Sequence, residues 1–292
     1  MSVKQLPVEP IDFHTHVGRV LSFNPRIKGW VESSLGDLLS YMNEAGVERA
    51  VVLSIPPRAD PYASFLSNSQ LLREVQPHQG RLIAFCCPSP LRRDAVSALK
   101  KLVEAGCRGL GEVKVGLRVD DPRLLKLLRA AESLGLPALI HVEEGPYFHY
   151  CHGVEALAEV LKGLPDLKLV VHGPGWWSRI SAEGTGDLYP SGPIRGEGLV
   201  HELLRRFDNL YADISANSGL NALRRDPEHT LRFIEEFQEK LIFGTDFPCL
   251  SDSGQFGPDR SHLDFLLKLC LPNRALRRIL RKNAERLLEK RV

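Results

Sequence analysis

The sequence has 292 residues, of which 43% are hydrophobic, enough to bury one large core. Its 38 Lys and Arg residues nearly balance 36 Asp and Glu residues, and the net charge of +2 is too small to indicate a nucleic-acid-binding surface. The segment Met1–Pro7 lacks the apolar run of a signal peptide, and no later stretch is long enough to cross a bilayer. We therefore expect a cytoplasmic protein with neither a nucleic acid nor a membrane as partner.

Short apolar runs alternate along the chain with longer amphipathic runs, a pattern typical of a parallel sheet covered by helices. In chain order, strands are predicted at Pro10–His14, Ala50–Ser54, Leu82–Cys86, Gly109–Val113, Ala138–His141, Lys168–Val171, Leu210–Ile214 and Leu241–Gly244. Helices are predicted at Leu35–Glu44, Asp94–Ala105, Pro122–Leu134, Gly153–Leu161, Gly198–Phe207, Pro227–Glu239 and Ser261–Leu269, followed by one or two closing helices in Asn273–Lys290. Eight alternating units favour an α/β fold, a (β/α)8 TIM barrel that forms a single domain over residues 1–292, over an open doubly wound sheet.

The segment from Gly173 to Gly196 interrupts this alternation. It follows the sixth predicted strand and contains six glycines and three prolines. Loops longer than about 12 residues are commonly functional, and active sites of barrels lie at the carboxyl ends of the strands. The segment is therefore predicted to be an insertion that serves as a lid or substrate loop.

His14 ends the first predicted strand, and His16 follows two residues later on the same face of the extended chain, so both imidazoles can reach one ion. Single ionisable residues also follow three other predicted strands, at His141, His172 and Asp246. The carboxyl ends of barrel strands converge on one cavity. We therefore predict that these five residues bind a divalent metal, with zinc as the first candidate, because zinc favours imidazole nitrogen and carboxylate oxygen.

The fourth predicted strand adds Glu112 and Lys114, which share a face. Glu112 is a candidate metal ligand or bridge between two metal ions. Lys114 could bind a substrate carboxylate or, if carbamylated, become a bridging ligand itself. An ordinary Glu–Lys ion pair at the barrel rim is the alternative, so the sequence leaves open whether the site holds one ion or two.

The sequence resembles the amidohydrolase superfamily, in particular its amidohydrolase-related branch, which includes the aminocarboxymuconate-semialdehyde decarboxylases. The resemblance covers nearly the whole chain and is carried by D-F-H-T-H at 12–16, the two later histidines, F-G-T-D-F-P at 243–248 and N-A-E-R-L at 283–287. It implies four metal ligands, namely His14, His16, His141 and Asp246. It also implies that His172 binds a second metal or positions the reactive water. Glu112 departs from the pattern and is similar to the acidic position on strand four of TatD-like nucleases, where a Glu can bridge two metals.

Two reactions fit such a centre. A metal with an open coordination site lowers the pKa of bound water towards about 7 and polarises a substrate oxygen. Asp246 is then the candidate general base, and His172 could orient the water or stabilise oxyanion charge. We favour hydrolysis of an amide, lactone or related carbonyl compound over the alternative, non-oxidative decarboxylation of an unsaturated carboxylic acid. A TatD-like phosphodiesterase and a non-catalytic metal-binding barrel are further alternatives.

Several side chains that follow predicted strands are candidates for substrate contact. They are Lys114, Arg19, Arg58, Tyr147 and Trp176. Arg and Lys suit a carboxylate, and Trp supplies a flat apolar wall, so we expect a small-molecule substrate that carries a carboxylate. Barrels often dimerise through outer helices, and the closing helix has an apolar side, so a homodimer is also considered.

Overall fold

The computed structural model describes residues 6–22, 29–146, 148–184, 186–248 and 260–289. Within these residues, eight parallel strands form one sheet in which each strand pairs with the next along the chain. The strands are β1 (Ile11–Thr15), β4 (Arg49–Leu53), β6 (Leu82–Cys86), β7 (Gly109–Val113), β8 (Ala138–His141), β11 (Leu169–His172), β12 (Leu210–Asp213) and β13 (Leu241–Ile242). The prediction of a (β/α)8 barrel is confirmed.

The last strand returns to the first and brings the ends of the barrel together. The amide of Phe13 donates to the carbonyl oxygen of Phe243 at 3.0 Å, and the amide of Asp246 donates to the carbonyl oxygen of His14 at 2.8 Å. These bonds place the segment that carries Asp246 directly beside the end of β1. Two of the predicted ligands, 232 positions apart in the chain (246 minus 14), therefore lie side by side.

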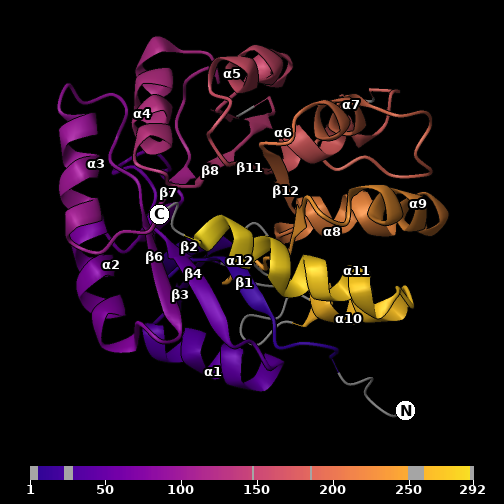
Figure 1. The fold of residues 1–292 in the computed structure, drawn as a ribbon, viewed down its shortest axis with the longest axis horizontal. Helices are drawn as coiled ribbons and strands as arrows, with labels where there is room; N and C mark the ends of the chain where they lie inside the picture. The colour runs from indigo at the N-terminus through magenta and orange to yellow at the C-terminus, as the bar shows by residue number, and fades with distance from the viewer. Residues whose placement is uncertain (1–5, 23–28, 147, 185, 249–259, 290–292) are drawn as a thin grey trace.

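Helices surround the sheet and follow one another around it in chain order, from the indigo α1 to the yellow α10 (Figure 1). They are α1 (Leu35–Ala45), α2 (Asn68–Val75), α3 (Ala95–Glu104), α4 (Pro122–Ser133), α5 (Leu157–Gly163), α7 (Leu199–Arg206), α8 (Ala216–Arg224), α9 (Pro227–Phe237) and α10 (Ser261–Lys268). None of the helices in the described part of the chain has the length and hydropathy needed to span a bilayer.

The ends of these helices follow local chemistry. Ser34 and Asp37 form a capping box at the start of α1, and Gly46 ends that helix in the left-handed conformation with a φ of 73°. Pro122 occupies the first position of α4, where a missing amide proton costs nothing, and the side chain of Asp121 caps the same end. Such signals are why the predicted and observed bounds of α1 and α4 differ by one residue at most.

Apolar side chains fill the barrel interior, so the barrel is a packed core rather than a pore. The cluster consists of Ile11, Phe13, Val51, Leu53, Phe85, Leu139, Val170, Tyr211 and Ile242 from the strands, with Ala284 and Leu287 from α12 (Asn283–Leu288). Because α12 contributes to this cluster, it closes the end of the barrel opposite the predicted site. The helix α11 (Asn273–Arg277) and a π-helical turn, η4 (Arg278–Lys282), lead into α12, which confirms the predicted closing helices.

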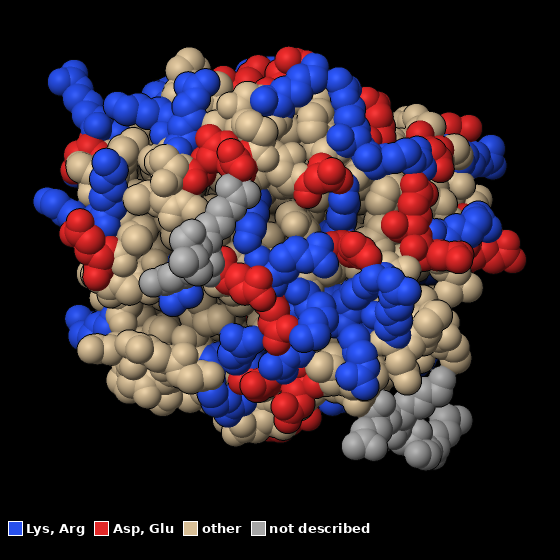
Figure 2. Space-filling view, in the orientation of Figure 1, with Lys and Arg blue, Asp and Glu red and all other residues tan. Residues whose placement is uncertain are grey.

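Charged side chains attach this closing segment to the barrel. Arg281 forms ion pairs with Glu48 and Glu285, and Arg278 pairs with Glu239 at 2.5 Å. On the face that Figure 2 presents, Lys and Arg side chains gather near the closing helices and are interspersed with Asp and Glu. Arg278 and Arg281 of this segment are therefore paired with acidic neighbours.

Two small sheets, which the sequence did not predict, cover the carboxyl end of the barrel. One is antiparallel and contains β3 (Gly29–Ser33), β2 (Gly18–Ser22) and β5 (Ala63–Phe65) in that order, and the other pairs β9 (Glu143–Glu144) with β10 (His149–Tyr150). At Gly18, with a φ of 133°, a Cβ would stand 2.5 Å from the carbonyl oxygen of Ser64, so only glycine allows β2 and β5 to approach this closely.

The segment after β11 differs from the predicted insertion in its first part. Residues Pro174–Trp177 form a short helix, α6, that packs into the core, and the side chains of Trp176 and Trp177 are 0% and 1% exposed. Pro at the first helical position favours this helix, and burial of two large indoles stabilises it. The role of the remaining residues, up to Gly196, as a lid or substrate loop remains a prediction.

Candidate metal centre

The first half of the site is built at the junction of β1 with the segment after β13. His14 Nε2 and His16 Nε2 lie 3.1 Å apart. Asp246 Oδ1 lies 3.3 Å from the first of these atoms and 3.4 Å from the second. The three side chains are one of two groups in the described chain whose ligand atoms all lie within 4.8 Å of one another. They therefore have the spacing needed to hold one ion.

The second half lies on β7, β8 and β11 and adjoins the first, because the ring centroids of His14 and His172 are 4.4 Å apart and His14, Glu112 and His172 form the second such group. His141 and His172 are register partners on adjacent strands, and His141 Nδ1 lies 2.9 Å from His172 Nε2. Glu112 Oε1 lies 2.9 Å from the former nitrogen and 3.1 Å from the latter. The other oxygen, Glu112 Oε2, lies 3.4 Å from His16 Nε2 in the first half. The two oxygens of Glu112 thus face different groups of imidazoles.

Three of the four imidazoles have an acceptor at the nitrogen that points away from the centre. The pairs are His14 Nδ1 with Asp213 Oδ2 at 2.7 Å, His16 Nδ1 with Leu53 O at 2.9 Å and His141 Nε2 with Glu143 Oε2 at 3.1 Å. A carbonyl or an ionised carboxylate only accepts, so these outer nitrogens carry the protons. When an ion displaces the protons on the inner nitrogens, their lone pairs are left facing the centre, as metal binding requires.

Residues outside the predicted ligand set complete this arrangement. The outer nitrogen of His172, Nδ1, lies 3.1 Å from Ser215 Oγ, which in turn lies 2.8 Å from Asp213 Oδ2. The sequence reasoning missed Asp213, Ser215 and Glu143. Asp213 has the same signal as the predicted ligands, because it is an ionisable residue at the carboxyl end of a strand.

A buried carboxylate, Asp12, fixes the first half of the site from behind. It accepts hydrogen bonds from the amide of His14 at 3.1 Å, the amide and hydroxyl of Thr245 at 3.0 and 2.6 Å, and the hydroxyl of Tyr41 at 2.9 Å. It therefore ties the end of β1 to the residue before Asp246. Asp246 itself has a φ of 60°, a sparsely populated conformation for a residue with a Cβ, which the surrounding contacts maintain.

The ionisation of the centre suits a cation. Burial alone would lower the pKa of His14, but the carboxylates of Asp246 and Asp213 outweigh burial and raise the pKa to about 10. Burial alone would raise the pKa of Glu112, but hydrogen bonds from neighbouring imidazoles, first that of His141, hold it well below its usual range. Carboxylates that draw positive charge onto nearby imidazoles also favour a divalent ion, which displaces protons when it binds. The residues therefore fit a metal.

Lys114 forms an ion pair with Asp60 and not with Glu112, its partner in the alternative that the sequence left open. Its Nζ lies 2.6 Å from Asp60 Oδ2 and 5.0 Å from the ring centroid of Tyr150. Burial alone would lower the pKa of Lys114, but the carboxylates of Asp60 and Glu112 outweigh burial and raise it, so the ammonium group stays charged. The side chain retains 19% exposure, which leaves a cation accessible near the mouth of the barrel.

The other predicted substrate contacts are not brought together with Lys114. The guanidinium of Arg19, whose side chain is 51% exposed, lies over the exposed ring of Trp30 at 4.8 Å. Arg58 is exposed and adopts a φ of 61° in the loop after β4. Tyr147 lies outside the described residues. Trp176 belongs to the core between the barrel and its helices, so the prediction that it lines a substrate surface is wrong.

Aromatic side chains from the two small sheets lie beside the centre. Phe65 stacks on the imidazole of His16, with centroids 4.2 Å apart and ring planes within 9° of parallel. Tyr150 contacts the imidazole of His141 edge to face at 5.9 Å, and Phe148 stacks on Tyr150 at 6.0 Å. These rings form an apolar wall that the sequence did not reveal, because β5 and β10 are too short to produce a strand pattern.

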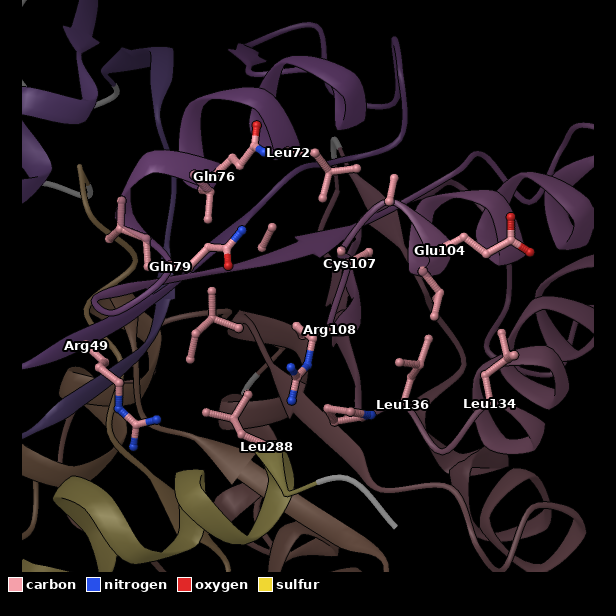
Figure 3. A pocket seen from close by; sticks show the side chains of 18 of the residues that line it. Arg49, Leu72, Gln76, Gln79, Glu104, Cys107, Arg108, Leu134, Leu136 and Leu288 are labelled. Atoms are coloured by element: carbon pink, nitrogen blue, oxygen red, sulfur yellow. The ribbon is translucent and has the colours of Figure 1, made fainter. Parts of the chain in front are cut away.

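A cavity of about 960 Å³ lies at the opposite end of the barrel (Figure 3). It is lined by the turns that precede β6, β7 and β8, including Gln79 and Arg108, and by Leu288 of α12. None of the described residues that line it belongs to the metal centre. Active sites of barrels lie at the carboxyl ends of the strands, so the centre and not this cavity is the candidate active site.

The fold and centre define a class of protein, the barrel enzymes with histidine and carboxylate ligands for metal at the carboxyl ends of the strands. Residues 11–290 match the family model described as amidohydrolase, and the chain belongs to this family. No curated protein matches the sequence. The family expected from the sequence is thereby confirmed.

Solved structures share the fold over almost the whole chain. A probable 2-pyrone-4,6-dicarboxylic acid hydrolase from Acinetobacter baumannii, with citric acid bound, is 18% identical with a TM-score of 0.65, and the match covers 96% of this chain and 99% of that one. A 2,6-dihydroxybenzoate decarboxylase from Rhizobium is 17% identical with a TM-score of 0.63, covering 96% and 98%. A dihydroxybenzoic acid decarboxylase from Polaromonas, with bound manganese and 2-nitroresorcinol, is 13% identical with a TM-score of 0.59, covering 96% of both chains. These three structures are named as a hydrolase and two decarboxylases, and the chain, as a member of the amidohydrolase family, is an enzyme of this metal-dependent class.

Proposed function

We propose that the protein is a metal-dependent hydrolase that activates water for attack on an amide, lactone or related carbonyl group of a small carboxylate-bearing substrate. The observation that carries the proposal is the position of Glu112. Its carboxylate stands between two groups of imidazoles and directs one oxygen towards each. A carboxylate in this position is suited to hold two metal ions close together.

The donor set divides into two sites that share Glu112. The first consists of His14, His16 and Asp246, and the second of His141 and His172. Imidazole nitrogen and carboxylate oxygen are ligands that zinc favours, and they also accept manganese. We therefore propose two ions, with zinc as the leading candidate. Divalent ions here would lower the pKa of water and polarise a substrate carbonyl.

Asp246 is the proposed general base. Its side chain is 25% exposed, whereas those of His14, His16 and Glu112 are 4% exposed or less. It is therefore the carboxylate of the centre that a substrate and a water molecule can reach from the mouth of the barrel. One oxygen faces the histidines of β1, and the other can accept a proton from water and return it to the leaving group.

His172 is proposed as a ligand rather than as a residue that positions water. It is 1% exposed and lies between Glu112, His141 and Ser215. These contacts leave its inner nitrogen directed at the centre.

Lys114 is the proposed contact for the substrate carboxylate. It carries a positive charge next to the centre, and Asp60 holds its ammonium group in place. Binding of a negatively charged group by a lysine that is already positioned requires little ordering of the side chain. The aromatic wall of Phe65 and Tyr150 would exclude water from the apolar part of the substrate.

A panel of substrates tests the reaction type. Protein loaded with zinc or manganese is assayed against lactones, amides, unsaturated carboxylic acids and phosphodiesters, with product acid and carbon dioxide measured separately. The proposal predicts turnover of a lactone or amide that is lost in an Asp246→Asn variant. Carbon dioxide release from an unsaturated acid would establish the decarboxylase alternative, and phosphodiester cleavage the TatD-like one. Tight binding of small molecules without any turnover, unchanged in His14→Ala, would support a non-catalytic barrel.

A further inference from the structure

A buried hydrogen-bond network links the two halves of the metal centre on the side that faces β12. Asp213 ends β12, and Ser215 follows it, with its amide donating to Asp213 Oδ1 at 2.8 Å. Both residues are 0% exposed. Neither was among the ligand candidates, yet each contacts a histidine of the centre.

Four contacts around Asp213 Oδ2 and Ser215 Oγ determine where the protons lie, and in one of them Ser215 Oγ is 3.2 Å from His14 Nδ1. Asp213 Oδ2 is 2.7 Å from His14 Nδ1 and 2.8 Å from Ser215 Oγ. Two oxygen atoms at 2.8 Å need a proton between them, and an ionised carboxylate has none to give. The hydroxyl proton of Ser215 therefore points at Asp213, and its remaining acceptor capacity is directed to its other neighbours.

His172 is the neighbour that this arrangement constrains. Its Nδ1 lies 3.1 Å from Ser215 Oγ. Because the only hydroxyl proton of Ser215 is already committed to Asp213, the hydrogen bond requires a proton on His172 Nδ1. The inner nitrogen, Nε2, is then the one left for a metal ion, and it lies 3.1 Å from Glu112 Oε1.

The same carboxylate orients His14. Its Nδ1 donates to Asp213 Oδ2, so Nε2, which faces Asp246, is the nitrogen left for a metal ion. His14 belongs to the first half of the centre and His172 to the second. We propose that Asp213 and Ser215 are positioning residues that fix the tautomers of one ligand from each half, so that the affinities for the two ions depend on one shared network.

Close packing maintains the network. At Gly244, a Cβ would stand 2.7 Å from Asp213 Oδ1 and 2.9 Å from the Cβ of His14. A side chain at this position would force the carboxylate or the imidazole to move. The indole nitrogen of Trp177 also donates to the backbone oxygen of Asp213 at 2.9 Å. This bond assigns a role to an indole in the buried segment after β11.

This inference rests on the proposed two-ion centre and makes a separate prediction. Groups that orient metal-ligating histidines typically change metal affinity about 10-fold to 100-fold when they are altered. In Asp213→Asn, the amide can present its NH2 to His14 Nδ1, which favours the wrong tautomer, and it also disturbs Ser215. Both dissociation constants should therefore rise by about 10-fold to 100-fold. Ser215→Ala removes the hydrogen-bond acceptor for His172 Nδ1 and should raise the dissociation constant of at least one ion by about 10-fold.

The experiment is a titration of metal-stripped protein with Zn²⁺ in the presence of a competing chelator, with Co²⁺ absorption spectra as a second readout. Ser218→Ala is the matched control, because Ser218 is a nearby buried serine with no hydrogen-bond partner for its hydroxyl among the described residues. Ser215→Thr should restore the affinity, because it restores the hydroxyl. Thermal unfolding of each stripped variant shows whether it is folded.

The outcomes separate this inference from the proposed function. Two ions in the wild type with unchanged affinities in both Asp213→Asn and Ser215→Ala would overturn the network and leave the metal centre intact. If Asp213→Asn weakens the binding of only one of the two ions, the proposal that Asp213 and Ser215 serve both ions would be overturned. Absence of any bound ion in folded wild-type protein would instead contradict the proposed function. If Asp213→Asn does not fold, the comparison of Ser215→Ala with Ser215→Thr and Ser218→Ala decides the question.

Discussion

Replacement of Glu112 by Gln tests the proposed sharing of one carboxylate between two ions. Gln preserves the size of the side chain but converts one acceptor oxygen into an NH2 donor and removes the negative charge. The three nearest imidazole nitrogens lie 2.9, 3.1 and 3.4 Å from the carboxylate, so its two oxygens stand where each group of imidazoles would hold an ion. Whichever way the amide turns, one group of imidazoles faces an NH2 in place of the carboxylate oxygen that would help hold its ion. We expect metal content to fall from two ions to one at most.

The size of the effect follows from the loss of a charged ligand. A change in a residue that merely supports a ligand costs up to about 100-fold in affinity, so loss of a ligand should exceed about 100-fold, or about 3 kcal/mol. Metal content after dialysis and competitive chelation measure it. Glu144→Gln is the matched control, because Glu144 accepts hydrogen bonds from the amides of Gly153 and Val154. Two ions bound to Glu112→Gln with wild-type affinity would refute the reasoning.

Four further changes have defined outcomes. Asp246→Asn should lower kcat by at least about 100-fold in initial-rate assays, as expected for a general base, and a wild-type kcat would remove that role. Lys114→Met should raise KM for a carboxylate-bearing substrate and leave the KM of its methyl ester unchanged; equal effects on both would count against a carboxylate contact. Trp176→Ala should lower the free energy of unfolding by about 3 to 5 kcal/mol in urea titrations, because it empties a fully buried site, and a neutral change would contradict its assignment to the core. Burial, and then the neighbouring His229, lower the pKa of His201 to about 4. Below about pH 6.5 the unfolded chain binds a proton at His201 that the folded chain does not bind. The free energy of unfolding of the wild type should therefore fall by about 2 kcal/mol more than that of His201→Phe between pH 6.5 and 4. If the two plots of unfolding free energy against pH run parallel, His201 does not contribute.

The barrel was predictable because its strands are buried on both faces and therefore appear as short apolar runs. Each of the eight predicted strands overlaps an observed one, and the closing helix was found from its own pattern. The helices α2 and α8 were missed. The first is only eight residues long, and the second contains Asn, Ser and Gly, which are weak helix formers, so tertiary packing stabilises it.

The ligand candidates were predictable because chemistry and position coincide in them. An ionisable residue at the end of an apolar strand, or just beyond it, has few structural roles. His14, His141, His172 and Asp246 all stand in such positions. Asp213 does as well and could have been recognised. Ser215 could not, because a serine before a helix is indistinguishable in sequence from an ordinary N-cap.

Side chains at the mouth were the least predictable part. The partner of Lys114 is Asp60, which lies in a loop 54 positions earlier, and no local pattern joins the two. The position of Trp176 after a strand suggested a substrate wall, but Pro174 begins a helix that turns the indole into the core. Loop conformation therefore decided these roles, and it depends on contacts between distant segments.

Metal content and activity measured on the same sample test the central claim most directly. The wild-type chain, purified with Zn²⁺, should contain two ions, lose its lactone or amide hydrolysis when a chelator removes them, and recover that activity when Zn²⁺ or Mn²⁺ is restored. Folded protein that contains no metal, or that hydrolyses its substrate equally well before and after chelation, would contradict the account.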